Sequence, residues 1–327
     1  MAFPSYSISI RTLGTAGNKF RQELESIKIQ TVKPEKVLVY IAEGCLRPKY
    51  TIGEEEYVWV KKGMVAQRTL PYDEISSDCI LMLDDDVQLA PDSAERMLKA
   101  IEENGADAVG ADVFQNHRMS LRTKAYAAIT NLVFPHRSSK WAFKVCRNES
   151  FSYNSHPVKL FYWSQSCGGP AVLWRKDAFI KLHFEDELWL DSLGFAYGDD
   201  LLETYKLYKN GGRLGVLYDA GITNLDAQSS SAGFKKSPEH IYVRTKASYM
   251  IWYRCLYRNG KDTATSRFAA AMAFGFKSLW LFLVMCGAAI IKWDGYFISS
   301  YFRGLRDGIR VVRSPEFRSI PAYCLYK

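Results

Sequence analysis

The sequence has little cysteine, no Cys-x-x-Cys pair and no secretory leader. Its seven cysteines are scattered over 327 residues, which argues against both a zinc site and an extracellular disulfide framework and favours a reducing compartment. The chain does not begin with a basic segment followed by an apolar one. We therefore expect no cleaved secretory signal and a first domain that stays in the cytoplasm.

No compositional extreme is present either. The chain has 22 glycines and 11 prolines, and it is 48% apolar and 24% charged. These values exclude a disordered chain, a collagen-like chain and a disulfide-stapled miniprotein. At roughly 150 residues per domain, the length predicts one large domain with an appendage, or two domains.

Acidic residues are sparse near the carboxyl end of the chain. Residues 235–327 carry 16 Lys or Arg and 5 Asp or Glu, whereas residues 1–234 carry 27 and 30. The net charge of +8 therefore belongs to the tail. Because the basic residues of the tail are interleaved with a long apolar segment rather than forming a groove, we expect no nucleic-acid partner.

Strand and helix patterns alternate along the first two hundred residues. Continuous apolar runs such as residues 37–41 and 79–83 predict strands that are buried on both faces. The alternation predicts an α/β fold with a mostly parallel sheet flanked by helices. Residues 115–165 predict a helix near 121–133 and then a mobile loop. Helices are further expected at 20–27, at 64–75, from Asp92 with Glu95 as its capping partner, and at 200–209.

The longest apolar stretch, residues 268–291, contains one charged residue, Lys277. It barely supplies the length of a membrane span, and because both flanks are basic, a single span would place one of them on the wrong side of the bilayer. We therefore expect helices that lie in the cytoplasmic membrane interface or dip into it as a hairpin, held by anionic lipid headgroups. The alternative is the buried core helix of a soluble protein.

Three consecutive carboxylates, Asp84, Asp85 and Asp86, end a predicted buried strand. The carboxyl ends of parallel strands face the ligand crevice of an open α/β sheet. Because residues i and i+2 lie on the same side of an extended chain, Asp84 and Asp86 can converge on Mg²⁺ or Mn²⁺ with a bound diphosphate, while Asp85 points away. One alternative is a solvated turn; a calcium loop is the other, but it needs glycine where Leu89 stands.

A second acidic pair, Asp199 and Asp200, stands where a helix is expected to begin. An acid at that position is often only an N-cap, which accounts for one of the two. If the amino terminus of the helix borders the crevice, Asp200 can accept a proton from a hydroxyl substrate. Metal ligands on one side and a base on the other indicate group transfer.

In their order along the chain, these motifs resemble those of the family 2 glycosyltransferases of bacterial type, which have the nucleotide-sugar-binding GT-A fold. The resemblance runs over residues 6 to about 226. It rests on Thr12 after the first strand, Gln30-Thr31, Ala42-Glu43-Gly44, Ala66-Gln67-Arg68, the three aspartates with Pro91-Asp92 after them, and Asp199-Asp200.

The resemblance implies metal-dependent, inverting transfer of one sugar from a nucleoside-diphosphate sugar to a hydroxyl of a glycan or lipid-linked acceptor. Asp200 would be the general base, Asp199 would lie on the acceptor side, and Asp84 and Asp86 would hold Mn²⁺ or Mg²⁺. Arg68 could instead be a surface residue. Gly168 and Gly169 could form only a turn. Residues implied to bind the nucleotide sugar are Thr12, Glu43, Arg68, Asp84, Asp85, Gly168 and Gly169.

The sequence departs from the family pattern in places. Ala42 stands where the family has the first of two acids, so recognition of the base would rest on Glu43 alone, and Asp199 replaces the usual glutamate. Where many relatives have a histidine as a further metal ligand, this chain has Asn224 and Asp226, and the sequence does not choose between them. The Gln-x-x-Arg-Trp element of processive synthases is absent, which favours transfer of a single sugar.

We therefore expect a GT-A glycosyltransferase domain at residues 1–234 and a basic, apolar, helical membrane-associating region at residues 235–327. Similar bacterial proteins extend lipid-linked glycans for surface polysaccharide, so the expected location is the cytoplasmic face of the inner membrane. Two other functions stay open. One is a sugar nucleotidyltransferase, which also presents acids at a strand end; the other is a non-catalytic, membrane-tethered protein that binds a nucleotide sugar.

Overall fold

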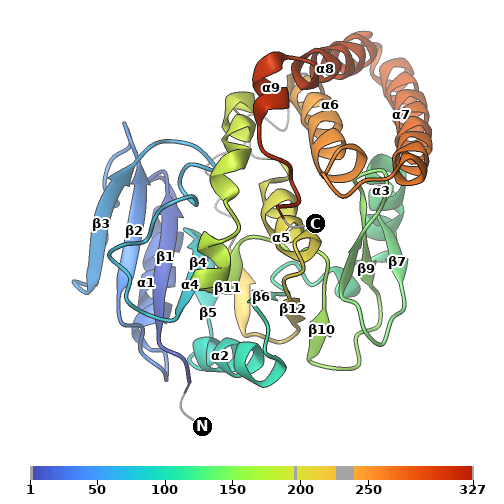
Figure 1. The fold of residues 1–327 in the computed structure, drawn as a ribbon. Helices are drawn as coiled ribbons and strands as arrows, with labels where there is room; N and C mark the ends of the chain where they lie inside the picture. The colour runs from blue at the N-terminus through green and yellow to red at the C-terminus, as the bar shows by residue number, and fades with distance from the viewer. Residues whose placement is uncertain (1–2, 195–196, 226–238, 326–327) are drawn as a thin grey trace.

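The computed structural model describes residues 3–194, 197–225 and 239–325. Its centre is a sheet of eight strands (Figure 1). These strands are β1 (Tyr6–Thr12), β2 (Val37–Ala42), β3 (Glu55–Val60), β4 (Cys79–Asp84), β6 (Ala108–Ala111), β10 (Phe161–Trp163), β11 (Ala171–Arg175) and β12 (Leu214–Leu217). Their order across the sheet is β10-β12-β6-β11-β4-β1-β2-β3.

The sheet is mixed but mostly parallel. Strand β1 pairs in parallel with β2 and β4, β2 with β3, and β6 with β12. Strand β11 is inserted antiparallel between β4 and β6, and β10 lies antiparallel on the edge beside β12. The predicted α/β fold with a mostly parallel sheet flanked by helices is confirmed.

Helices cover both faces of the sheet, and two smaller sheets lie beside it. The helices are α1 (Asn18–Lys28), α2 (Ser93–Asn104), η1 (Asn116–Arg118), α3 (Leu121–Asn131), α4 (Lys176–Ile180), η2 (Phe184–Leu193), α5 (Asp199–Lys209), α6 (Glu239–Trp252), η4 (Tyr253–Tyr257), α7 (Ala264–Lys292), α8 (Tyr296–Val312) and α9 (Pro315–Ser319). The small sheets pair β5 (Val87–Leu89) with β13 (Ile222–Asn224), and β9 (Phe151–Asn154) with β7 (Phe134–His136) and β8 (Phe143–Val145).

Alternating side chains of the strands build two hydrophobic layers. Leu81 and Leu83 of β4 pack with α1 and α2 on one face of the sheet, whereas Ile80 and Met82 point to the other face. The period of two follows from the pleat of the strand. The second face is covered by α4, η2, α5 and α6, so the sheet lies between two helical layers.

Two local predictions are wrong. Residues 64–75 form turns instead of a helix. The Asp191 carboxylate caps the first turn by accepting the backbone N–H groups of Val65 and Ala66 at 2.8 and 3.0 Å, but Pro71 prevents the helix from continuing. Residues 134–163, expected as a mobile loop, contain β7 to β10. The helix predicted near 121–133 is confirmed as α3.

The carboxyl-terminal helices share the core of the sheet. Ile251 of α6, Val312 of α8 and Tyr323 lie in the same buried cluster as Trp174 of β11. Beneath them, the buried Glu187 carboxylate of η2 pairs with Arg254 at 2.8 Å and with Lys206 at 3.3 Å. The boundary at residue 234 falls outside the described residues, so the division into two regions stays a prediction.

Helix α7 is long and apolar enough to cross a membrane, by length and composition only. Only 11% of its most apolar window is buried, which argues against the core-helix alternative. Ala270, Phe274 and Lys277 form its packed face at helical spacing. The opposite face is exposed and apolar, with Phe268, Met272, Phe276, Leu279 and Leu283.

Helix α8 packs closely on α6 through glycines. A Cβ added to Gly304 would lie 2.5 Å from the backbone oxygen of Tyr242, whereas one added to Gly287 of α7 meets nothing within 4 Å. We predict that Gly304→Ala lowers the free energy of unfolding by about 1–3 kcal/mol, because the helices are forced apart. The matched control Gly287→Ala should be neutral or raise it by about 0.5–1 kcal/mol. Thermal unfolding in detergent measures both, and equal effects of the two substitutions would contradict this packing.

Candidate active site

The carboxyl end of β4 meets a positively charged neighbour on β1. The parallel register places Arg11 beside Asp84, and the Arg11 Nε donates to Asp84 Oδ1 at 2.6 Å. A second nitrogen of Arg11 lies 3.4 Å from Asp199 Oδ2, at the start of α5. One guanidinium therefore links the two acidic segments, which are more than a hundred residues apart in the sequence.

Arg68 forms the second link. Its guanidinium lies 2.8 Å from Asp200, 3.3 Å from Asp199 and 3.1 Å from Glu203, all carboxylates on the first two turns of α5. The Arg68 side chain is buried, so the surface alternative does not hold. Three carboxylates around one planar guanidinium match the fork geometry that arginine offers and lysine does not.

The two aspartates at the start of α5 have different environments. Burial raises the pKa of Asp199, and the Asp200 charge adds to that effect. Burial alone would also raise the pKa of Asp200, but Arg68, Arg11 and a backbone hydrogen bond from Gly169 outweigh it and leave that pKa below its usual value. The Asp200 side chain is 34% exposed and that of Asp199 only 11%. Asp200 is therefore the ionised member that a ligand can reach.

Gly169 leaves the space that Asp200 occupies. A Cβ on Gly169 would lie 1.9 Å from Asp200 Oδ1 and 2.7 Å from a nitrogen of Arg68. A Cβ on Gly168 would instead meet the ring of Phe114 at 2.7 Å, and that ring is largely exposed. The glycine pair therefore does more than form a turn, because Gly169 is in contact with the acidic network.

Asp85 lies on the other side of the strand end from its neighbours. Its Oδ2 accepts a 2.5 Å hydrogen bond from the Thr12 hydroxyl, and both residues are buried. Burial, opposed by this hydrogen bond, raises the pKa of Asp85 to about 6, with further contributions from Asp84 and Asp86. Thr12 and Asp85 therefore contact each other, and their predicted part in donor binding stays a prediction.

Asp86 follows β4 and Glu43 follows β2, and these two strands are separated in the sheet by β1. The Asp86 backbone oxygen accepts the N–H of Leu225 at 2.7 Å, just after Asn224 of β13, whereas Asp226 lies outside the described residues. The side chain of Glu43 is exposed and, within the part of the chain that the structure describes, makes no hydrogen bond or ion pair. The structure therefore leaves the predicted roles of both acids open.

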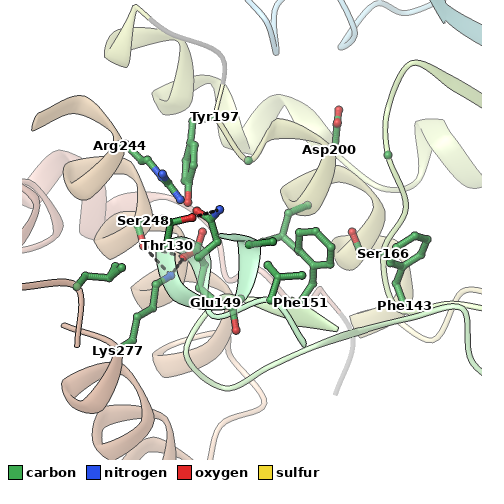
Figure 2. A pocket seen from close by; sticks show the side chains of 18 of the residues that line it. Thr130, Phe143, Glu149, Phe151, Ser166, Tyr197, Asp200, Arg244, Ser248 and Lys277 are labelled. Carbon is green, nitrogen blue, oxygen red and sulfur yellow. Dashed lines mark hydrogen bonds and ion pairs between the residues drawn. The ribbon is translucent and has the colours of Figure 1, made fainter. Parts of the chain in front are cut away.

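A large cavity adjoins Asp200. It has a volume of about 540 Å³ and is bounded by Gly168, by α5 and by the helices α3, α6, α7 and α8. Figure 2 shows Asp200 at one end of this cavity and Lys277 at the other. Volumes of this size are typical of small-molecule sites. Asp86 does not line the cavity.

Sequence reasoning missed two members of the network. Glu203 lies four residues after Asp199, so helical spacing could have placed it on the same face of α5; burial raises its pKa to about 7 against the opposing effect of Arg68. Arg11 had no such signal, because its contact with Asp84 depends on the register of β1 against β4.

The region around this network matches a known family. Residues 59–181 match the family model described as glycosyl transferase family 2, and β4 with the three aspartates lies within that match. Residues 59–181 are therefore similar to the family 2 glycosyltransferases, and the chain is a glycosyltransferase. No curated protein matches it by overall sequence.

Two solved structures support the fold of this glycosyltransferase. The crystal structure of S. aureus TarS residues 1–349 has a TM-score of 0.53 and 14% identity, and the match covers 94% of this chain and 81% of that one. The same segment in complex with UDP-GlcNAc has a TM-score of 0.52 with the same identity and coverage. At this identity the similarity supports the GT-A fold and says nothing about substrates.

The glycine pair yields a test of the network in this glycosyltransferase. We predict that Gly169→Ala lowers the turnover of sugar transfer by about 100-fold, because the added methyl group displaces Asp200 and Arg68. Gly168→Ala is the matched control, and it should keep transfer within a few-fold because the exposed Phe114 ring can move. Steady-state transfer rates on folded variants measure both. Equal losses of turnover in the two variants would contradict the claim that transfer depends on the contact between Gly169 and Asp200.

Proposed function

We propose that this glycosyltransferase moves one sugar from a nucleoside-diphosphate sugar to a hydroxyl group of a glycan or lipid-linked acceptor, with inversion at the anomeric carbon. The observation that carries the proposal is the pairing of Asp84 with Arg11 and of Asp200 with Arg68, the two arginines being linked through Asp199, while Asp200 is among the residues that line the cavity. The UDP-GlcNAc complex of TarS supports a nucleotide-sugar donor.

Asp200 accepts the proton of the acceptor hydroxyl in this proposal. Its lowered pKa keeps it ionised at neutral pH, and Arg68 and Gly169 fix the direction of its carboxylate. The hydroxyl oxygen attacks the anomeric carbon from the face opposite the leaving nucleoside diphosphate, so the configuration inverts. Asp199, on the acceptor side, stays bound between the two arginines.

The strand end of β4 is the proposed place of a divalent ion, Mg²⁺ or Mn²⁺. Within residues 3–194, 197–225 and 239–325 no group of three or more His, Cys, Asp or Glu side chains could hold a metal. Mg²⁺, however, is commonly bound by one or two carboxylates together with substrate phosphates, and Asp86 with Asp84 supplies that set. When bound, the ion stabilises negative charge on the leaving diphosphate. Arg11, already beside Asp84, adds positive charge at the same place.

The exposed apolar face of α7 supports a membrane location for the reaction. Exposed arginines of α8, among them Arg306 and Arg310, supply positive charge for anionic lipid headgroups. We place the enzyme on the cytoplasmic face of the inner membrane, where the nucleotide-sugar donor is soluble and a lipid-linked acceptor of polysaccharide biosynthesis is within reach.

The base assignment is tested by Asp200→Asn. This variant should bind nucleoside diphosphate as the unaltered enzyme does, because the donor lies on the Asp84 side, and its turnover should fall by about 10²–10⁴-fold. Asp177→Asn, an equivalent change in the first turn of α4 at a largely exposed position, is the matched control and should change neither property. Calorimetry with nucleoside diphosphates and a transfer assay measure the two quantities; unchanged transfer by Asp200→Asn would refute the assignment.

A further inference from the structure

The walls of the cavity beside Asp200 are mostly apolar. Its walls include Phe143 and Phe151 from the three-stranded sheet and Phe274, Leu281 and Met285 from α7. A sugar, which carries a hydroxyl on most of its carbons, would leave these walls in contact with polar groups. The lining instead suits a hydrocarbon chain. Only the end of the acceptor that carries the reacting hydroxyl has to lie near Asp200.

Most polar side chains of the cavity already have partners. Lys277 forms an ion pair with Glu149, and both bind the hydroxyl of Ser248, at 3.1 and 2.7 Å (Figure 2). Asp112 lies 3.0 Å from His117. The ion pair of Lys277 with Glu149 holds α7 against the catalytic fold, so these two charges are not available to a ligand.

Arg244 of α6 differs from these groups. It lines the same cavity and lies over the ring of Tyr197 (Figure 2). Within residues 3–194, 197–225 and 239–325 it has no carboxylate partner. An unpaired guanidinium beside an apolar space favours an anionic group, and a phosphate provides oxygens in the geometry that arginine binds best.

The cavity reaches the seam between α3 and α7. Ala127 and Thr130 of α3 line it from one side, and Leu281 of α7 lines it from the other; the two helices are joined there by the Trp280 Nε1–H, which donates to the Ile129 oxygen at 2.8 Å. Exposed apolar side chains continue outward from this seam on both helices. They are Leu121, Tyr126 and Ile129 on α3, and Phe276, Leu279 and Leu283 on α7.

We propose that the cavity binds a phosphate-bridged lipid acceptor that enters laterally from the membrane between α3 and α7. The hydrocarbon chain lies in the seam and along α7, the phosphate contacts Arg244, and the hydroxyl-bearing end reaches Asp200. This inference rests on the proposed glycosyl transfer at Asp200 and specifies its acceptor class. It also makes α3, within the catalytic fold, part of the membrane-facing surface.

Binding of farnesyl phosphate to the full-length protein in detergent tests the inference by calorimetry. We expect saturable binding that is at least about ten-fold tighter than that of farnesol or of inorganic phosphate, because chain and phosphate each contribute. Arg244→Gln should weaken the binding of farnesyl phosphate about ten-fold or more. The matched control is Arg21→Gln, an exposed arginine of α1 outside the cavity, which should leave binding unchanged.

A second variant tests the route of the chain. Leu281→Trp fills the seam and should weaken the binding of farnesyl phosphate but not that of inorganic phosphate; its thermal unfolding shows whether it is folded. Dioleoylphosphatidylglycerol separates a lipid acceptor from an ordinary membrane lipid, because the inference expects weaker binding of this two-chain lipid. Equal affinity for it with the same dependence on Arg244, or unchanged binding by Arg244→Gln, would overturn the inference.

The failure of this inference can be told apart from a failure of the proposed function. An enzyme that hydrolyses or transfers from a nucleoside-diphosphate sugar but does not bind farnesyl phosphate refutes the lipid site and leaves glycosyl transfer standing. A protein that binds farnesyl phosphate through Arg244 and turns over no nucleotide sugar supports the lipid site and refutes the transfer.

Discussion

Two guanidinium groups, the buried one of Arg68 and the partly buried one of Arg11, hold the crevice of this glycosyltransferase together. Without Arg11 and Arg68, the like charges of Asp84, Asp199 and Asp200 would repel one another with no positive charge between them. With them, charges of opposite sign alternate from β1 across to α5. The arrangement keeps Asp200 ionised and partly exposed, which is the state that a proton acceptor at neutral pH requires.

Buried ion pairs also hold the carboxyl-terminal helices against the catalytic fold. Glu187, Arg254 and Lys206 form one buried ion cluster under α6, and Glu149 with Lys277 forms another under α7. The one charge within the long apolar stretch of α7 therefore faces the protein and leaves the outer face entirely apolar. Helices α6, α7 and α8 form walls of the cavity that is the candidate acceptor site. Helix α7, which carries the exposed apolar face, is therefore also part of that site.

The alternation of apolar runs predicted most strands of the sheet, because strands buried on both faces have a strong local signature. The turns at residues 64–75 have a local signal in Pro71, which breaks a helix, whereas their contact with the distant Asp191 has none. Local patterns found Asp84 and Asp200 as candidates, and the resemblance to the family added Gly169. They could not find that Arg11 lies beside Asp84, because strand register is a long-range property. The buried environment of Arg68 had the same long-range origin.

The central claim is that Arg68 acts on catalysis by orienting Asp200, and a double-mutant cycle on sugar transfer tests it most directly. Arg68→Gln should lower turnover by about 100-fold in the unaltered enzyme and by no more than about three-fold in the Asp200→Asn background, because the group that it orients is already lost. The same loss in both backgrounds would mean that Arg68 and Asp200 act independently, and it would contradict the account given above.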